Sequence, residues 1–169
     1  MSHPRYDGDV PERGFSFLAD EVRRPGPFAR EEVETALQRY FELAAHGTAT
    51  GDWHPWVDLF TEDAIYVEHS FGVMRGREAI RDWVTTVTGE RPSPLEVSDG
   101  WHVIDNDLVV VYTLNRFPAP DHGDPYQFIG LSPFCYAGDG LWCYEEDITS
   151  TSEIARIGAL YGDASRAQR

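Results

Sequence analysis

The second half of the chain contains four consecutive extended segments, and this pattern limits the fold more than any other feature. Residues 95–104, 108–117, 126–137 and 141–150 are rich in β-branched and aromatic side chains, as strands usually are. Short stretches of glycine, proline, asparagine and aspartate separate these segments. Neighbouring segments are therefore expected to pair as an antiparallel meander.

The first half is mainly helical by its apolar spacing. A long amphipathic helix is predicted from Glu31 until around Gly47, and a short helix follows with Asp52 as its N-cap. One strand, near residues 64–69, precedes a third amphipathic helix that begins after Gly76. Helices followed by strands predict an α+β fold, in which a cone-shaped, curved antiparallel or mixed sheet wraps around three N-terminal helices.

Length and composition fit one domain with an extended arm. A chain of 169 residues, 41% of them hydrophobic, is long enough to enclose a core with a pocket. Prolines and scattered charges mark residues 1–29 as an extended arm, whose residues Phe15, Phe17 and Leu18 are available to pack on the body. The body is expected to span residues 30–161, and residues 162–169 are expected to form a tail.

The charge of the chain excludes several kinds of partner. A net charge of -15 leaves no basic surface for nucleic acid or for an anionic membrane. All of the basic residues among Lys and Arg are arginine, so lysine Schiff bases and phosphate-binding lysine loops are excluded. The N-terminal residues show no apolar targeting segment, and the expected location is the cytoplasm.

Two cysteines flank a turn signal between the last two extended segments. Cys135 and Cys143 lie on either side of Gly138-Asp139-Gly140. A two-residue loop would place them on opposite faces of a hairpin, whereas a three-residue loop would place them side by side. In a reducing compartment, two free structural thiols are expected.

Glu68 is the first candidate for acid/base chemistry. It alternates with Val67 and shares a strand face with Tyr66, just before a turn. A buried carboxylate there would have its pKa raised towards neutrality, which suits a general base. The alternative is an exposed carboxylate at the end of a strand.

Other candidates lie on the first helix and on the last strand. Tyr40 is on the apolar side of its helix, so its hydroxyl needs a buried partner or a substrate oxygen. Strict alternation places Glu145 and Asp147 on one face of the last strand and Glu146 on the other, so either face brings a carboxylate to the cone. These acids lack a histidine at a familiar ligand spacing, and no metal is expected.

Further side chains are candidates for the wall of a pocket that binds a flat, apolar molecule. His102 is either a core histidine or a catalytic one, and Arg116 pairs either with a substrate carboxylate or with an acid of this chain. The chain contains no dinucleotide-binding or phosphate-binding fingerprint, so chemistry without a cofactor is expected. The predicted substrate-binding residues are Tyr66, Trp56, Trp83, Tyr112, Arg116, Phe128, Ser132 and Glu145.

Three motifs lie within or next to the predicted elements: Leu37-Gln38-Arg39-Tyr40-Phe41-Glu42-Leu43, Phe60-Thr61-Glu62-Asp63-Ala64 and Gly76-Arg77-Glu78-Ala79-Ile80. These motifs and the order of the elements resemble the nuclear transport factor 2-like superfamily, in the branch of ketosteroid isomerase, scytalone dehydratase and SnoaL-like polyketide cyclases. The resemblance covers about residues 30–161 and implies a homodimer through the outer face of the sheet.

The resemblance also implies roles for individual residues. Tyr40 falls where the isomerases place an oxyanion-hole tyrosine, and Glu68 where they place the carboxylate that shuttles the proton. The second oxyanion donor of the isomerases, a protonated aspartate, falls at Ser132, so the full isomerase site is not matched. His102 resembles the pocket histidine of the dehydratases, and Asp147 resembles the acid/base aspartate of the cyclases.

These observations predict a cofactor-independent dehydratase, isomerase or cyclase that acts on a small hydrophobic carbonyl or hydroxyl compound. Glu68 would abstract the proton, Asp147 or His102 would return it, and Tyr40 would steady the enolate oxygen. One alternative is an epoxide hydrolase of the limonene epoxide type, which would use Asn115, Arg116 and Asp147. The other is a non-catalytic module for ligand binding or dimerisation.

Overall fold

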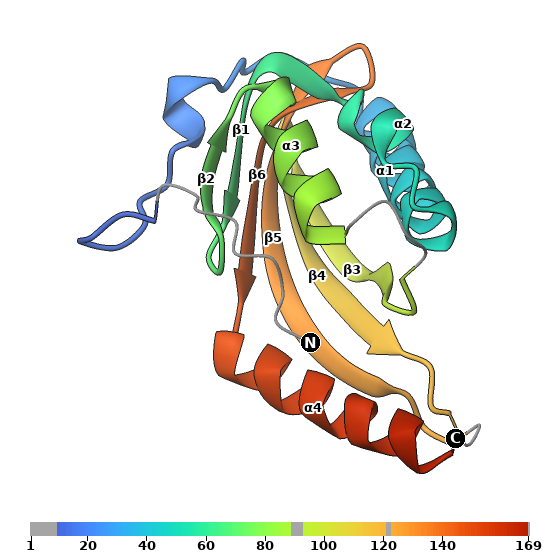
Figure 1. Ribbon diagram of the computed structural model, residues 1–169. Coiled ribbons are helices and arrows are strands. Elements are labelled where there is room, and N and C mark those ends of the chain that lie inside the picture. Colours follow the sequence, from blue (N-terminus) through green and yellow to red (C-terminus); the bar gives the residue numbers. More distant parts are fainter. Residues whose placement is uncertain (1–9, 89–92, 121–122, 169) are drawn as a thin grey trace.

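A six-stranded mixed sheet organises the residues that the computed structural model describes, namely 10–88, 93–120 and 123–168 (Figure 1). The strand order is β2-β1-β6-β5-β4-β3. Strands β1 and β6 pair in parallel, and all other neighbours pair antiparallel. The strands are β1 (Phe60–Glu68), β2 (Gly72–Arg75), β3 (Glu96–Asp105), β4 (Leu108–Phe117), β5 (Tyr126–Gly138) and β6 (Leu141–Thr149).

Four helices and one short 3₁₀ turn accompany the sheet in the described part of the chain. Helix α1 packs on β3, α3 packs on β1 and β2, and α2 joins α1 to α3. Helix α4 lies across the other end of the sheet, beside β5 (Figure 1). The elements are η1 (Ala19–Glu21), α1 (Arg30–Thr50), α2 (His54–Val57), α3 (Arg77–Thr88) and α4 (Thr151–Ala167).

The α+β class, the three N-terminal helices and the four-strand meander are confirmed, and the four meander strands start and end within one residue of the predicted bounds. Strand β1 begins at Phe60, four residues before the predicted strand. Strand β2 and helix α4 were not predicted. Helix α4 begins after Ser150, whose hydroxyl accepts a hydrogen bond from the Glu153 amide, and it runs through most of the predicted tail. The predicted breaker at 89–92 and the loop residues 121–122 lie outside the described residues.

Gly47 is inside helix α1 and does not end it, contrary to the sequence prediction. The helix continues to Thr50 and is closed by Gly51, which has a left-handed φ of 82°. The reason for glycine at position 47 is packing, because a Cβ there would lie 2.6 Å from the indole ring of Trp53. Gly47 therefore lets the loop after α1 fold back onto the helix.

Replacing Gly47 with alanine is expected to lower the free energy of unfolding by about 1–3 kcal/mol, because the Trp53 ring must move. Gly158→Ala in helix α4 is the matched control, since no atom lies within 4 Å of a Cβ there. The control is expected to stabilise the protein by about 0.5–1 kcal/mol. Chemical denaturation of both variants measures the difference, and equal stabilities would contradict the described contact.

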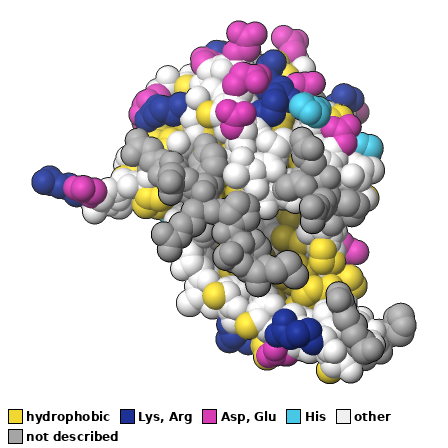
Figure 2. Space-filling view, in the orientation of Figure 1, with side chains coloured by type: hydrophobic (Ala, Val, Ile, Leu, Met, Phe, Trp, Pro, Cys, Tyr) yellow, Lys and Arg dark blue, Asp and Glu magenta, His cyan; other side chains and the backbone are white. Residues whose placement is uncertain are grey.

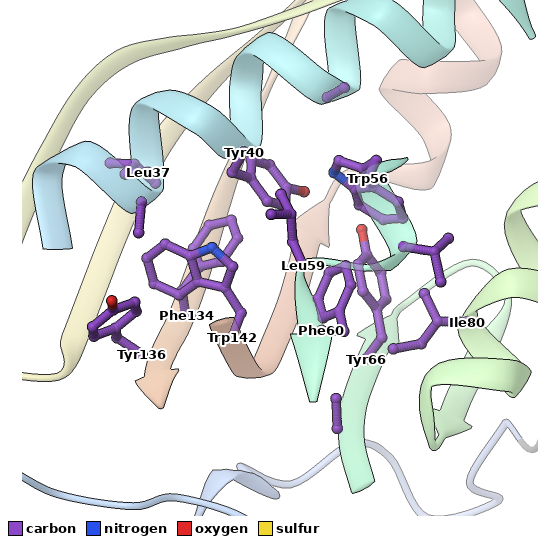
Figure 3. Close-up of a cluster of buried hydrophobic side chains, with 14 of the residues drawn as sticks. Leu37, Tyr40, Trp56, Leu59, Phe60, Tyr66, Ile80, Phe134, Tyr136 and Trp142 are labelled. Atoms are coloured by element: carbon purple, nitrogen blue, oxygen red, sulfur yellow. The ribbon is translucent and has the colours of Figure 1, made fainter. Parts of the chain in front are cut away.

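The main core is aromatic and lies between α1, α2 and the concave face of the sheet (Figure 3). Phe60, Phe134, Tyr136 and Trp142 have no exposed surface. Trp142 is in ring contact with Phe134 and Tyr136, each at a centroid distance of 5.3 Å. Such angled ring contacts add to the stabilisation from the area that the rings bury, so this cluster fixes how α1 lies on β5 and β6.

The N-terminal arm covers part of the convex face of the sheet, as Phe15, Phe17 and Leu18 suggested. Phe15 stacks on His69 at a centroid distance of 4.3 Å, and Phe17 meets Tyr144 edge-on at 5.3 Å. Ala19 is fully buried in a second apolar cluster on this face. The arm is thus part of the folded body from at least Phe15 onward.

The hairpin between β5 and β6 contains a two-residue loop and an irregular pairing. Asp139 and Gly140 both have positive φ, 55° and 77°, as a tight hairpin requires. The register shifts twice: Ala137 is an extra residue of β5 between the Gly138–Leu141 and Tyr136–Trp142 pairs, and Cys143 is an extra residue that bulges out of β6 before the Cys135–Tyr144 pair.

This bulge changes the faces on which the side chains lie. A regular two-residue hairpin would place Cys135 and Cys143 on opposite faces, but both lie in the same convex-face cluster, and Cys143 Sγ is 3.5 Å from the Cys135 carbonyl oxygen. The strict alternation predicted for the last strand is wrong here, because Trp142 faces the main core while Tyr144 faces the opposite side. Both cysteines are free thiols, as predicted.

None of the described helices combines the length and the hydrophobicity needed to cross a bilayer. In the space-filling view, acidic and basic side chains are mixed over the upper part of the molecule, and hydrophobic side chains gather lower down, above α4 (Figure 2).

Candidate active site

A cavity of about 180 Å³ lies between the three N-terminal helices and the concave face of the sheet. Its wall is mostly aromatic and apolar, and most of its polar groups come from the strands. The predicted lining residues that do line it are Tyr66, Trp56, Trp83, Ser132 and Glu145, joined by the predicted catalytic residues Tyr40 and Asp147.

Glu145 is the most deeply buried acid of the cavity, with 1% of its surface exposed. The Tyr40 hydroxyl, which comes from α1, donates a hydrogen bond to Glu145 Oε1 at 2.6 Å. The second oxygen, Oε2, is buried and has no hydrogen-bond partner among the described residues. Glu145 thus offers a free carboxyl oxygen to an aromatic enclosure, in which the indole nitrogens of Trp53, Trp56 and Trp83 also lack a partner among the described residues.

Asp147 follows on the same face of β6 and has two hydroxyl partners. The Tyr66 hydroxyl donates to Oδ2 at 2.5 Å, and the Ser132 hydroxyl donates to Oδ1 at 2.6 Å. Figure 3 shows the Tyr40 and Tyr66 hydroxyls on the same side of the core, both near Trp56. Two acids and two phenols therefore meet at one end of the cavity.

Both carboxyl groups are harder to ionise than free acids. Burial raises the pKa of Glu145 well above its ordinary value, and the neighbouring Asp147 raises it further, while the phenols of Tyr40 and Tyr66 oppose the change. Burial also raises the pKa of Asp147, against the hydrogen bonds from Ser132 and Tyr66. Two like charges in one dry site are unfavourable, so the pair favours holding one proton.

The surroundings favour placing that proton on Glu145. Asp147 accepts two hydroxyl hydrogen bonds and is partly exposed, whereas Glu145 accepts one and is enclosed. Hydrogen bonds and water stabilise the charged form of a carboxyl group. The arrangement can therefore supply a carboxylic acid and a carboxylate side by side.

Glu68 is buried, with 7% of its surface exposed, but it does not face Tyr40 and does not line the cavity. It ends β1 opposite Asp147 in the parallel register, and its Oε2 accepts a hydrogen bond from the Ser70 amide at 2.9 Å. Glu68 was expected to act on the same substrate as Tyr40, but its carboxylate turns to the backbone of the following turn, and the acid beside Tyr40 is Glu145.

Burial raises the pKa of Glu68 to about 7, and the charge of Asp147 adds to this effect. Between pH 4.5 and about 7, the folded protein keeps a proton on Glu68 that the unfolded chain releases. The free energy of unfolding is therefore highest below this pH window and falls as the pH rises through it. Wild type should therefore lose about 3 kcal/mol more than Glu68→Gln between pH 4 and pH 8.

Denaturant unfolding at several pH values measures this loss. Glu62→Gln is the control, because Glu62 is exposed on the same strand, and it should follow the wild-type curve. Parallel curves for Glu68→Gln and wild type would contradict the burial of Glu68.

The remaining predicted site residues do not line this cavity. His102 Nδ1 lies 2.5 Å from Asp99 Oδ2, in a separate surface groove between α1 and β3. Arg116 donates to Gln127 Oε1 at 3.3 Å. Tyr112 stacks on Trp101 at a centroid distance of 5.3 Å. Phe128 is buried but does not border the cavity.

Sequence reasoning missed part of the wall. Thr113 and Asn115 line the cavity from β4, on the face whose preceding members, Val109 and Val111, are buried in the main core. The alternation of residues 109–115 could have predicted that these two side chains face the interior. Trp53 also lines the cavity, held there by its contact with Gly47.

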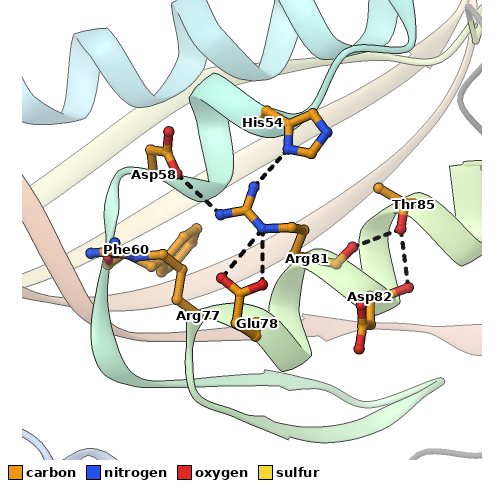
Figure 4. Close-up of polar contacts among 8 residues, drawn as sticks. All are labelled: His54, Asp58, Phe60, Arg77, Glu78, Arg81, Asp82 and Thr85. Atoms are coloured by element: carbon orange, nitrogen blue, oxygen red, sulfur yellow. Dashed lines mark hydrogen bonds and ion pairs between the residues drawn. The ribbon is translucent and has the colours of Figure 1, made fainter.

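Arg81 fixes the helix that brings Trp83 to the cavity (Figure 4). Its guanidinium lies 2.8 Å from His54 Nδ1 and donates to Asp58 Oδ1 at 3.1 Å, and it also pairs with Glu78. These contacts join α3 to α2 and to the loop before β1. They hold two aromatic walls of the cavity, Trp56 and Trp83, at a set separation.

Comparison with known proteins finds one family and many similar folds. The family model described as SnoaL-like domain matches residues 37–145. No curated protein matches the chain. An NTF2-like protein from Anabaena variabilis is 21% identical, with 73% of this chain and 93% of that chain covered and a TM-score of 0.59.

Two further structures are similar in fold. A protein assigned as a SnoaL-like polyketide cyclase from Jannaschia sp. CCS1 is 20% identical, with 80% of this chain and 96% of that chain covered and a TM-score of 0.59. The epoxide hydrolase/cyclase-like enzyme SalBIII, which has a role in pyran ring formation in the polyether salinomycin, is 18% identical, with coverage of 73% and 94% and a TM-score of 0.56. At these identities, the similarity concerns the fold.

Proposed function

Because the chain belongs to the SnoaL-like domain family, we propose that it is an acid/base enzyme that needs no cofactor. The proposed substrate is a small hydrophobic carbonyl or hydroxyl compound, such as a polyketide-like or steroid-like metabolite, and the reaction is a dehydration, an isomerisation or a cyclisation. The observation that carries the proposal is the pair of Glu145 and Asp147, each bonded to a phenol inside one aromatic cavity.

In this proposal, Asp147 is the base and Glu145 is the acid. Ionised Asp147 takes a proton from the carbon next to the substrate carbonyl, and neutral Glu145 donates from Oε2 to the carbonyl oxygen. Tyr40, which donates to Glu145 Oε1, steadies the charge that develops on this carboxyl group as it gives up its proton.

Glu68 keeps a supporting role in the proposal. Its position opposite Asp147 and its pKa of about 7 suit a group that exchanges protons between Asp147 and solvent near neutral pH. In this proposal the catalytic base is therefore Asp147, and not Glu68 as the sequence had suggested. His102 takes no part in the reaction, because it lies in another groove.

Proton exchange tests the proposal without knowledge of the natural substrate. Purified protein is incubated in deuterium oxide with a panel of hydrophobic ketones, and loss of the α-proton signal is followed by NMR. At least one ketone should exchange faster than with an equal concentration of an inert protein. Binding of the same ketones without any faster exchange would instead favour a non-catalytic binding module.

Epoxide opening is a second candidate, favoured by the similarity in fold to SalBIII. Neutral Glu145 would protonate the epoxide oxygen, while Asp147 would take the proton of the attacking hydroxyl. The arrangement used by limonene-type hydrolases is not assembled, because Arg116 contacts Gln127 and does not line the cavity. The nucleophile would therefore be a hydroxyl of the substrate, and the product would be a cyclic ether.

We also propose that two copies of the chain pair through the convex face of the sheet. In one row across the strands, Trp101, Tyr112, Leu131 and Ile148 are register neighbours. Trp101, Leu131 and Ile148 are 52%, 39% and 42% exposed, and Val103 and Val110 extend the patch. A continuous apolar patch on a sheet face commonly marks a protein interface.

Leu131→Asp should convert such a dimer to a monomer, because it places a charge in the centre of the patch. Sedimentation velocity over a range of concentrations measures the result. Leu160→Asp on α4 is the control, since Leu160 is similarly exposed, at 45%, but lies on a different element. A wild-type protein that is monomeric at all concentrations would overturn this proposal.

A further inference from the structure

Among the described residues that line the cavity, none is basic. Asp147 and Glu145 are bonded only to hydroxyl groups in the described part of the chain: Tyr40 from α1, Tyr66 from β1 and Ser132 from β5. A buried charge whose hydrogen bonds all come from neutral groups is costly. This site therefore leaves room for a positive charge that the described cavity wall does not supply.

The nearest charged neighbours do not fill this role. Glu68, opposite Asp147, is another acid. Burial raises the pKa of Asp147, and His69 opposes this rise electrostatically. The ring nitrogen of His69, however, lies 2.8 Å from Glu146 Oε1 on the opposite face of β6, so its direct partner is Glu146 and not Asp147. His69 also stacks against Phe15 of the arm, away from the cavity.

The wall next to these acids is made of aromatic rings. Trp53 and Trp56 meet edge-on at a centroid distance of 5.5 Å, and Trp83 lies 4.8 Å from Tyr66. All four rings line the cavity. Tryptophan and tyrosine faces are electron-rich and attract organic cations, and rings set at angles around a carboxylate are the usual enclosure for a quaternary ammonium group.

We propose that the ligand of this cavity carries an organic ammonium group, which is seated among Trp53, Trp56 and Trp83 with its charge directed to Asp147. The proposal rests on the proposed function, since it names the substrate class of the same site: a hydrophobic amine that also bears the reacting carbonyl or hydroxyl group. A neutral ligand would fill the aromatic space but would leave the carboxylate unbalanced.

A pair of probes of equal shape tests the proposal. Benzyltrimethylammonium carries a permanent charge, and neopentylbenzene is its neutral isostere. Isothermal titration calorimetry at pH 8 should show that wild type binds the cation about tenfold or more tightly than the isostere. Equal or weaker binding of the cation would overturn the proposal.

Two variants locate the charge that is responsible. Asp147→Asn leaves only the enclosed Glu145, and its preference for the cation should fall to about twofold or less. Glu145→Gln imitates the protonated acid, so it should keep the preference of wild type. Loss of the preference in Glu145→Gln and its retention in Asp147→Asn would contradict the assignment of the charge to Asp147 and overturn the proposed seat.

Glu146→Gln controls for the loss of one negative charge, because Glu146 belongs to the same strand but faces away from the cavity. It should keep the wild-type preference. Circular dichroism confirms that each variant is folded before titration. If the isostere binds better than the cation while ketone exchange still occurs, the ammonium proposal fails and the acid/base function stands. If the cation binds more tightly than the isostere and no ketone exchanges, the acid/base function fails and the ammonium site stands.

Discussion

Asp147→Asn is expected to lower the rate of enzyme-dependent ketone exchange by roughly 10²–10⁴-fold, the usual contribution of a positioned general base. An asparagine has the same shape, and its oxygen accepts the hydrogen bond from one of the two hydroxyls, Tyr66 or Ser132, while its NH2 group donates to the oxygen of the other. Only a hydroxyl hydrogen has to turn, so the wall of the cavity should be retained. The amide cannot take a proton from carbon near neutral pH. The loss should therefore appear in kcat, with little change in KM.

Glu146→Gln separates this effect from a general loss of charge. The substitution removes one negative charge from the residue next to Asp147, but on the opposite face of the strand, where Tyr144 and His69 are its partners. Its exchange rate should stay within about twofold of wild type, because it touches no reacting atom. Equal losses in the two variants would show that Asp147 acts through the fold and not as a base.

Trp142→Ala is expected to lower the free energy of unfolding by about 3–5 kcal/mol, the cost of removing a large aromatic side chain from a packed core. Trp142 is wholly buried and touches Phe134 and Tyr136, which hold α1 on the sheet. Denaturation in urea, monitored by circular dichroism, measures the change. Leu160→Ala on the surface of α4 should change stability by no more than about 0.5 kcal/mol.

A small effect of Trp142→Ala would mean that the space it leaves collapses easily. Because Phe134 and Tyr136 are themselves fully buried, little free movement is available to fill the void. The loss is therefore expected to lie within the range given above. A change below about 1 kcal/mol would contradict the close packing of this cluster.

The sequence predicted the structure well where the spacing of apolar residues follows the regular repeat of a strand or a helix. Residues 108–117 alternate, and the structure places Val109, Val111, Thr113 and Asn115 on the concave face of β4. Tyr40 lies on the apolar side of α1 and was correctly expected to be buried with a partner for its hydroxyl. Such regular elements allow a residue's face to be read from its position.

The sequence was less informative where pairing is irregular or depends on distant residues. The hydroxyl of Tyr40 was expected to have a buried partner or a substrate oxygen, without a named residue, and the structure gives it Glu145, 105 positions away. Which acid meets Tyr40 depends on how α1 packs on a distant strand, and no local pattern reports that packing. Strand β2 was missed because it spans only Gly72–Arg75.

The irregular pairing beside the hairpin has a consequence for how such a protein changes over time. The extra residue in β5 and the extra residue in β6 offset each other, so Glu145 lies opposite Phe134, as in a regular two-residue hairpin. Loss of Cys143 would remove the extra residue of β6 and would leave Glu145 and the residues after it on their present faces. A change of one residue in length can thus be absorbed at this end of the sheet, and relatives that differ here in length can still present the same acids to a ligand.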